Sequence, residues 1–181
     1  HGRSVGFFTM VAATCVLGSQ SLVVGGLYSV ALGLWFTGIV LWAILTYAIV
    51  TILTVKTEKP TLAEGINGGW LVIVVASHSV AVLGAQLAPA MSEHAPKALL
   101  FALTMWLGGS MLYIWIISLI FYRYTFFALS PNDLAPPYWI NMGAAAIATL
   151  AGATLASAAP HSPVLERVLP FVRGLTLWWW A

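Results

Sequence analysis

GWLVIVVASHSVAVLGAQLA, residues 69–88, runs for about twenty residues without a charged side chain. A helix of this length spans the roughly 30 Å hydrocarbon core of a bilayer. The whole chain has the same character, because hydrophobic residues make up 61% of it and charged residues only 7%. A soluble domain has about 25% charged residues. The sequence therefore predicts an integral membrane protein, built as an all-α bundle of transmembrane helices.

Working outward from this run, the chain contains five apolar segments that are long enough to span a bilayer. The predicted spans are 5–24, 27–55, 69–88, 98–122 and 138–159, with a partial sixth from residue 169. The connectors are short, so residues 1–181 form a single transmembrane domain. After Pro60, Thr-Leu-Ala-Glu has the capping-box pattern and predicts a short surface helix.

The two ends of the chain suggest a piece of a longer protein. The chain begins at His1 without a methionine, and its last apolar run stops at Ala181 after about ten residues, roughly half of a span. We expect an internal fragment, and the alternative is a natural tail that inserts halfway.

Basic residues near helix ends indicate the orientation. One predicted face carries Arg3, Lys56, Lys59 and Arg123, and the other carries Lys97, Arg167 and Arg173. The bias of four against three favours the cytoplasm for the Arg3, Lys59 and Arg123 face. We expect the protein to lie in a bacterial inner membrane.

A short repeat links the odd-numbered segments. Residues 16–20, VLGSQ, match residues 82–86, VLGAQ, and residues 150–154, LAGAT, match more loosely. The odd segments are richer in small and polar residues and the even segments in bulky aromatics. Because small residues allow close helix packing and polar residues avoid lipid, we predict repeated hairpins with odd helices inside, lining a pore. The alternative is a coincidental match in an ordinary bundle.

The middle of the third segment holds the first candidate site residue, His78, between Ser77 and Ser79. An imidazole near the bilayer midplane needs a polar partner. That partner is either an anion or proton in the pore or a neighbouring helix. Asn141 either donates to a substrate carboxylate or caps the backbone near Pro136.

Three further side chains are candidates for the pathway. Thr14 and Thr149 offer hydroxyl donors, although threonine in a membrane helix often bonds to its own backbone. Arg123 ends the fourth segment, either as a residue that attracts anions to the pore mouth or as an interfacial anchor.

Several other classes of function lack support in the sequence. The acidic residues all lie in loops or at segment ends, and no Gly-x-Ser-x-Gly, Walker or HExxH motif occurs. The single cysteine, Cys15, excludes a disulfide framework. We therefore predict no enzyme, no metal and no cofactor, and the net charge of +2 gives no reason to expect nucleic acid.

Three stretches give the chain a family resemblance: residues 58–70 (EKPTLAEGINGGW), 111–123 (MLYIWIISLIFYR) and 136–144 (PPYWINMGA). Together they resemble the tellurite-resistance/dicarboxylate transporter family of the voltage-dependent anion channel superfamily. This family includes malate permeases and the plant guard-cell slow anion channels. The resemblance covers nearly the whole chain.

The resemblance implies ten helices in five hairpins around a central pore, with odd helices lining it, and a homotrimer with one pore per subunit. This chain would hold helices three to seven and the start of eight. Two features depart from the family pattern. The odd segments have no proline in mid-span, and the gating phenylalanine of the channels falls outside this piece.

The expected function is transport of small anions, most plausibly dicarboxylates such as malate, by a protein whose partners are the anion, the bilayer and two further copies of itself. The alternatives are a passive anion channel, a tellurite-resistance protein and, from another class, a membrane scaffold that transports nothing.

Overall fold

The computed structural model describes residues 5–128 and 136–181, and every regular element within them is a helix. The predicted all-α membrane bundle is thus confirmed. The long helices are α2 (Phe8–Val23), α3 (Tyr28–Val55), α5 (Val72–Leu87), α6 (Ala95–Phe126), α7 (Ile140–Ala158) and α8 (Pro163–Trp180). Short helical turns connect them: α4 (Leu62–Gly65), η1 (Gly68–Leu71), η2 (Ala88–Ala90), η3 (Ser92–His94), η5 (Pro136–Trp139) and η6 (Ala159–His161).

Four helical stretches in the described part of the chain are long and apolar enough to cross a membrane. They are Tyr28–Val55, Gly68–Ala90, Ser92–Phe126 and Pro136–His161. The α2 helix is apolar but shorter. At 1.5 Å per residue, the 28 residues of α3 and the 32 of α6 measure about 42 and 48 Å. Both exceed the roughly 30 Å hydrocarbon thickness, so these helices must tilt or project from it.

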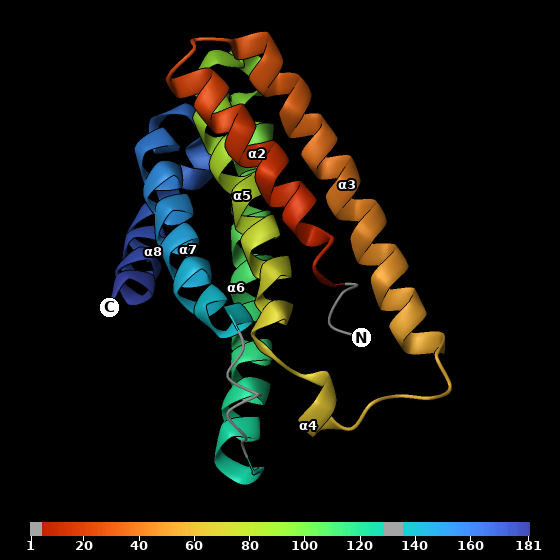
Figure 1. Ribbon diagram of the computed structural model, residues 1–181. Coiled ribbons are helices and arrows are strands. Elements are labelled where there is room, and N and C mark those ends of the chain that lie inside the picture. The colour runs from red at the N-terminus through yellow and green to blue at the C-terminus, as the bar shows by residue number, and fades with distance from the viewer. Residues whose placement is uncertain (1–4, 129–135) are drawn as a thin grey trace.

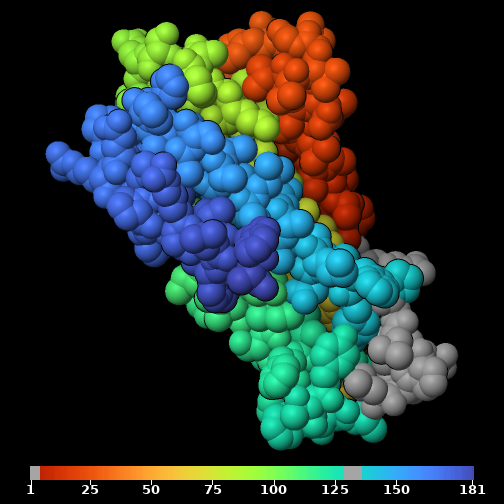
Figure 2. Space-filling view, turned by 90° about the vertical axis from the view of Figure 1, so that its left-hand side faces the viewer, coloured from red at the N-terminus to blue at the C-terminus, as the bar shows by residue number. Residues whose placement is uncertain are grey.

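The α5 helix forms the centre of the bundle. Figure 1 shows α2 and α3 on one side of it and α7 and α8 on the other, and α5 also packs against α6. In the most apolar stretch of each span, 83% of the residues are buried for α5, 6% for α3 and 39% for both α6 and α7. The helix α5 is therefore an inner helix and α3 an outer one, whereas burial does not separate α6 from α7. Figure 2 shows the side on which α7 and α8, in blue, cover the bundle, with the green end of α6 projecting beyond them.

Two local expectations need revision. The sixth helix begins at Pro163 and not near Leu169, because Ser162 accepts a hydrogen bond from the backbone N–H of Leu165 at 3.4 Å and proline is suited to the first turn. The first turns of α8 therefore contain charged residues. The apolar pattern alone placed the start of this helix too late. The short helix α4 does form, but the side chain of Thr61 makes no capping bond.

Tryptophan side chains join α3 to α5 and α6 to α7. From α3, the indole N–H of Trp35 donates to the carbonyl of Val80 in α5 at 3.0 Å. A Cβ on Gly84, one turn further along α5, would lie 2.9 Å from the same ring. The missing side chain therefore lets the indole lie directly on the backbone of α5.

The next hairpin repeats this contact. From α6, the indole N–H of Trp106 donates to the carbonyl of Ala148 in α7 at 2.9 Å, and a Cβ on Gly152 would lie 2.7 Å from the ring. In both cases the glycine follows the acceptor by one helical turn. Gly84 and Gly152 are the glycines on which the sequence repeat is aligned, whereas the third, Gly18, packs against Leu83 instead.

We predict that replacing Trp35 or Trp106 by phenylalanine lowers the stability of the detergent-solubilised protein by about 0.6–1.7 kcal/mol, the range for one hydrogen bond between membrane helices. Thermal unfolding measures the change. Trp115→Phe is the matched control, because Trp115 is 59% exposed on the outside of α6. Equal losses in all three variants would mean that ring area, and not the indole N–H, is responsible.

Candidate functional site

A pocket of about 290 Å³ that is open at the surface lies between α5 and α7, near the end of the bundle that carries the α5–α6 turn. Its polar lining residues are Gln86, Thr154 and Ser157, and the rest of its lining is small and apolar: Ala85, Pro89, Ala153 and Ala158. No charged side chain lines it. The pocket thus combines neutral polar groups with a narrow wall of small residues, on the helices predicted to line a pore.

Gln86 is the residue of this pocket with unused hydrogen-bonding capacity. The hydroxyl of Thr154 donates within its own helix to the carbonyls of Leu150 or Ala151, and that of Ser157 donates to Ala153 at 3.0 Å. The amide oxygen of Gln86 is buried and has no partner among the described residues. A glutamine amide offers two N–H donors and one acceptor, so it can turn either end towards a solute.

Gln86 was not among the predicted site residues, although the sequence contained a signal for it. It lies two residues after the repeat glycine Gly84. The equivalent positions after Gly18 and Gly152 hold Gln20 and Thr154. A polar residue therefore follows each of the three glycines at the same level of the bundle.

A second pocket of about 400 Å³ lies on the other side of α7, against α8. Arg173 and Thr176 line it together with Ala153, which also lines the first pocket. Arg173 is exposed. The exposed face of α7 therefore has a guanidinium group on one side and the Gln86 amide on the other.

His78 lies away from both pockets, fully buried between α5, α6 and α8. Its Nε2 is 3.1 Å from the carbonyl oxygen of Trp106, to which it donates in the tautomer protonated there. Its ring meets that of Trp179 edge to face at 5.7 Å between centroids. The Nδ1 atom has no partner in the described part of the chain. This geometry matches the alternative in which His78 bonds to a neighbouring helix.

The contact at Trp106 extends into a small polar network. The hydroxyl of Ser110 donates to the same Trp106 carbonyl at 2.8 Å and accepts from the indole N–H of Trp179 at 3.2 Å. The rings of Trp179 and Tyr113 also meet edge to face. Helices α5, α6 and α8 are thereby held together by polar contacts in the interior, which no pattern in the sequence predicted.

The two serines that flank His78 are also engaged. Ser77 donates to Ile73 of its own helix at 2.9 Å and accepts from the indole N–H of Trp42 in α3 at 2.9 Å. Ser79 donates to Val75 at 2.8 Å. Both serines are buried. Among the predicted site residues, Ser77 and His78 thus lie together in the interior, where they contact Trp42, Trp106 and Trp179.

The remaining predicted residues of the inner helices lie apart from Ser77 and His78. Asn141 accepts from the hydroxyl of Tyr113 at 2.8 Å. Thr14 and Thr149 donate to carbonyls one turn back in their own helices, at 2.8 and 3.0 Å. These contacts leave no open cluster formed by His78, Asn141 and the two threonines within the described structure.

Arg123 lies at the opposite end of the bundle from the Gln86 pocket and is only 7% exposed. Its Nε donates to the carbonyl of Ala63 in α4 at 2.6 Å, and its guanidinium donates to the hydroxyl of Tyr138 in η5 at 2.7 Å. Arg123 therefore ties two connecting segments to the end of α6. Arg3, which the sequence placed on the same face, lies outside the described residues.

Metal coordination has no visible basis in the part of the chain that the structure describes. No group of three or more histidine, cysteine, aspartate or glutamate side chains there lies close enough to hold an ion. The site chemistry consists of amide, hydroxyl, indole and guanidinium groups.

Comparison with known sequences gives a family match along almost the whole chain. Residues 3–181 match the voltage-dependent anion channel family. Two curated relatives, each called an uncharacterized membrane protein, come from Mycobacterium tuberculosis strains CDC 1551 / Oshkosh and H37Rv. Each is 40% identical over 70 residues, which is 39% of this chain and 35% of the relative. The match thus spans about a third of the length of each relative. No solved structure matches.

We predict that Gly109→Ala destabilises the protein by about 1–3 kcal/mol, the usual cost of overpacking. A Cβ on Gly109 would lie 2.7 Å from Nε2 of His78. The adjacent Gly108→Ala is the control, because no atom lies within 4 Å of its Cβ position. That variant should be neutral or gain up to about 1 kcal/mol from helix propensity.

A double variant makes this test specific to the imidazole. Combining Gly109→Ala with His78→Ala should recover part of the loss, since the added methyl then has room, and thermal unfolding of the four proteins gives the coupling energy. Strictly additive losses would contradict the packing described for His78.

Proposed function

The chain belongs to the voltage-dependent anion channel family, and from that premise we propose that it moves small anions across the membrane along its inner helices. We place the anion pathway at the pocket between α5 and α7. The observation that supports this is the half-buried side chain of Gln86, whose amide oxygen is buried without a described partner, on the wall of a pocket of small residues.

Neutral donors suit a conducting pathway. A pore must hold its ion well enough to admit it and weakly enough to release it, and the N–H groups of a neutral amide suit a site of this kind. The exposed Arg173, across α7 from Gln86, supplies positive potential beside the pathway without lying in its pocket. Anions are thus attracted by a peripheral charge and contacted by neutral groups.

Within this class we propose dicarboxylates such as malate as the substrate, moved by a gradient or by passive flow, in a homotrimer. These finer assignments rest on the family resemblance of the motif stretches. We further propose a bacterial inner membrane, with Lys59 and Arg123 on the cytoplasmic face. A passive anion channel and a tellurite-resistance protein remain alternatives within the same class, and an enzymatic role is not proposed.

We propose different roles in the anion pathway for the residues that the sequence predicted as site residues. Asn141, Thr14 and Thr149 lie on inner helix α2 or α7 and are retained as secondary contacts of the pathway. Ser77, Ser79 and His78 would act on the pathway only through the packing of α5. Arg123 would shape one mouth by holding α4 and η5 in place.

The tight helix contact of His78 favours one alternative from another class, a membrane scaffold without transport. A scaffold would bury its inner polar residues against neighbouring helices, as His78 is buried here. The Gln86 pocket argues for transport. The two functions therefore predict different behaviour for the reconstituted protein.

We predict that Gln86→Leu lowers anion flux about tenfold, the effect of losing a contact worth about 1.4 kcal/mol. Gln86→Glu should lower it further, because a carboxylate of the same size repels anions. Uptake of labelled malate, and of chloride as a second probe, into vesicles containing the full-length protein measures the flux. Thr37→Val is the control, since Thr37 lies on outer helix α3 and bonds only to Gly33 of its own helix.

The outcomes separate the proposals. Normal flux in both Gln86 variants would place the pathway elsewhere, and chloride flux without malate flux would replace the dicarboxylate assignment. Absence of any anion flux from the folded wild-type protein would favour the scaffold.

A further inference from the structure

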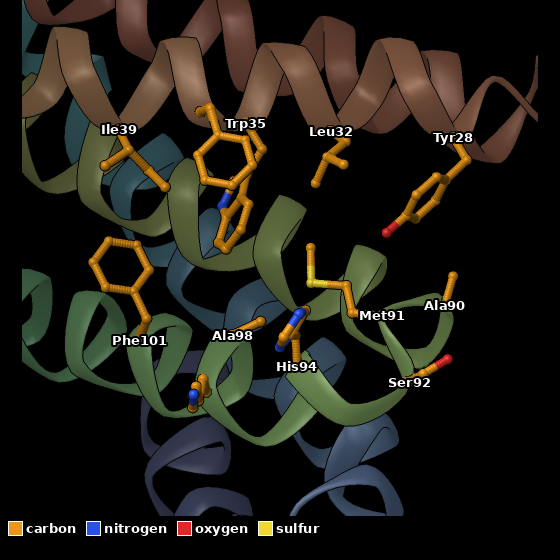
Figure 3. Close-up of a pocket in the computed structure, with 12 residues that line it drawn as sticks. Tyr28, Leu32, Trp35, Ile39, Ala90, Met91, Ser92, His94, Ala98 and Phe101 are labelled. Carbon is orange, nitrogen blue, oxygen red and sulfur yellow. The ribbon is translucent and has the colours of Figure 1, made fainter.

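A groove of about 710 Å³ lies between α3 and α6. It shares no described lining residue with the Gln86 pocket, although its Ala90 directly follows Pro89 of that pocket in η2. In Figure 3, Tyr28, Leu32, Trp35 and Ile39 extend from α3 on one side, and residues from the η2–η3 turn and α6 face them. The facing residues include Met91, Ser92, His94, Ala98 and Phe101. At the inner end, the rings of Trp35 and Phe101 meet edge to face, 6.0 Å between centroids.

The lining changes from polar to apolar along the groove. Tyr28 is the first residue of α3, and Ser92 and His94 belong to the turn before α6, so the polar groups gather where the helices begin. Lys97 follows within the first turn of α6 and is exposed. Beyond it the lining is apolar, and the one indole N–H there, that of Trp35, already donates to Val80.

The length of the groove corresponds to one leaflet of a bilayer. From Tyr28 to Ile39 the helix rises about 16 Å at 1.5 Å per residue. This is about half of the roughly 30 Å hydrocarbon core. An acyl chain that enters from the interface fits this length, whereas a transmembrane helix of a partner protein would run the whole thickness.

The charge of the groove is positive at its polar end. Among the described residues that line it, Lys97 is the one permanent cation and His94 the one imidazole, and none is acidic. The nearest acidic residue in the sequence is Glu93. Its carboxylate oxygen lies 3.8 Å from Nε2 of His94, and the Glu93 side chain is 85% exposed. A headgroup carrying a phosphate would therefore meet an ammonium group with only a solvated carboxylate nearby.

We propose that this groove is a binding site for an anionic glycerophospholipid, with its phosphate at Lys97 and one acyl chain between α3 and α6 as far as Trp35 and Phe101. A lysine at the polar end of the groove attracts an anionic headgroup, and the apolar depth supplies the chain contact that a free phosphate does not use. The lipid would fill the space between α3 and α6. No described residue lines both this groove and the Gln86 pocket.

The test uses the full-length protein purified in detergent. Thermal unfolding and native mass spectrometry are measured with phosphatidylglycerol, with phosphatidylcholine of the same acyl chains, and with glycerol phosphate. We expect phosphatidylglycerol to bind and stabilise the protein most. Lys97→Gln should weaken this binding about fivefold, the effect of one lysine near an anionic headgroup. Arg167→Gln is the control, because Arg167 is an exposed cation on α8 that does not line the groove.

A second variant tests the apolar part. Leu32→Trp should block the groove and reduce binding of phosphatidylglycerol while Lys97 remains. Should that variant fail to fold, Lys97→Gln, a change at an exposed side chain, still decides. Four outcomes would overturn the proposal: equal binding of both lipids, equal loss in the Lys97 and Arg167 variants, the same stabilisation by glycerol phosphate alone, or a change of oligomeric state in Leu32→Trp with lipid binding intact.

Discussion

The packing of this bundle depends on one repeated interaction, in which a tryptophan of α3 or α6 donates its indole N–H to a carbonyl of α5 or α7 beside a glycine. In hydrocarbon no water is present to satisfy an indole, and apolar contact with lipid is as good as apolar contact with another helix. A hydrogen bond therefore determines which neighbouring helix each helix packs against. Trp35 and Trp106 make the bond in the same way, and the missing side chains of Gly84 and Gly152 let the indoles reach the backbone.

The same constraint separates the polar residues into two groups. His78, Ser77 and Ser110 lie among the tryptophans and use their polar atoms to hold helices together, although one nitrogen of His78 has no described partner. Gln86 lies beyond this zone, in a pocket walled by small residues, and its amide oxygen is not used in packing. A polar residue in a membrane helix is thus informative about function only after its structural partners are known.

The sequence predicted the helices well because long apolar runs need no tertiary information. Two of the three repeat glycines, Gly84 and Gly152, lie against tryptophan rings, a contact that the sequence did not predict. The sequence also did not predict which side of each helix turns inward, because a helix that is apolar on all sides carries no such signal. Hence the partners of His78 could not be foreseen: Trp106 and Trp179 lie far along the chain, on helices whose rotation the sequence leaves open. The start of α8 was misplaced for a related reason, since its first turn is charged and was read as a connector.

The contact between tryptophan and glycine is directional, because the second helix of one hairpin supplies the indole and the first helix of the following hairpin supplies the carbonyl and the glycine. A contact of this head-to-tail kind relates unlike surfaces, as in cyclic assemblies of separate subunits. A duplicated hairpin would therefore carry both the donor tryptophan and the acceptor site with its glycine. It could be added in tandem and pack through the same kind of interface. Selection then needs to preserve only the indole, the glycine and the spacing between glycine and acceptor. The rest of each hairpin is free to diverge, which explains how repeats can keep one geometry while sharing only a few letters.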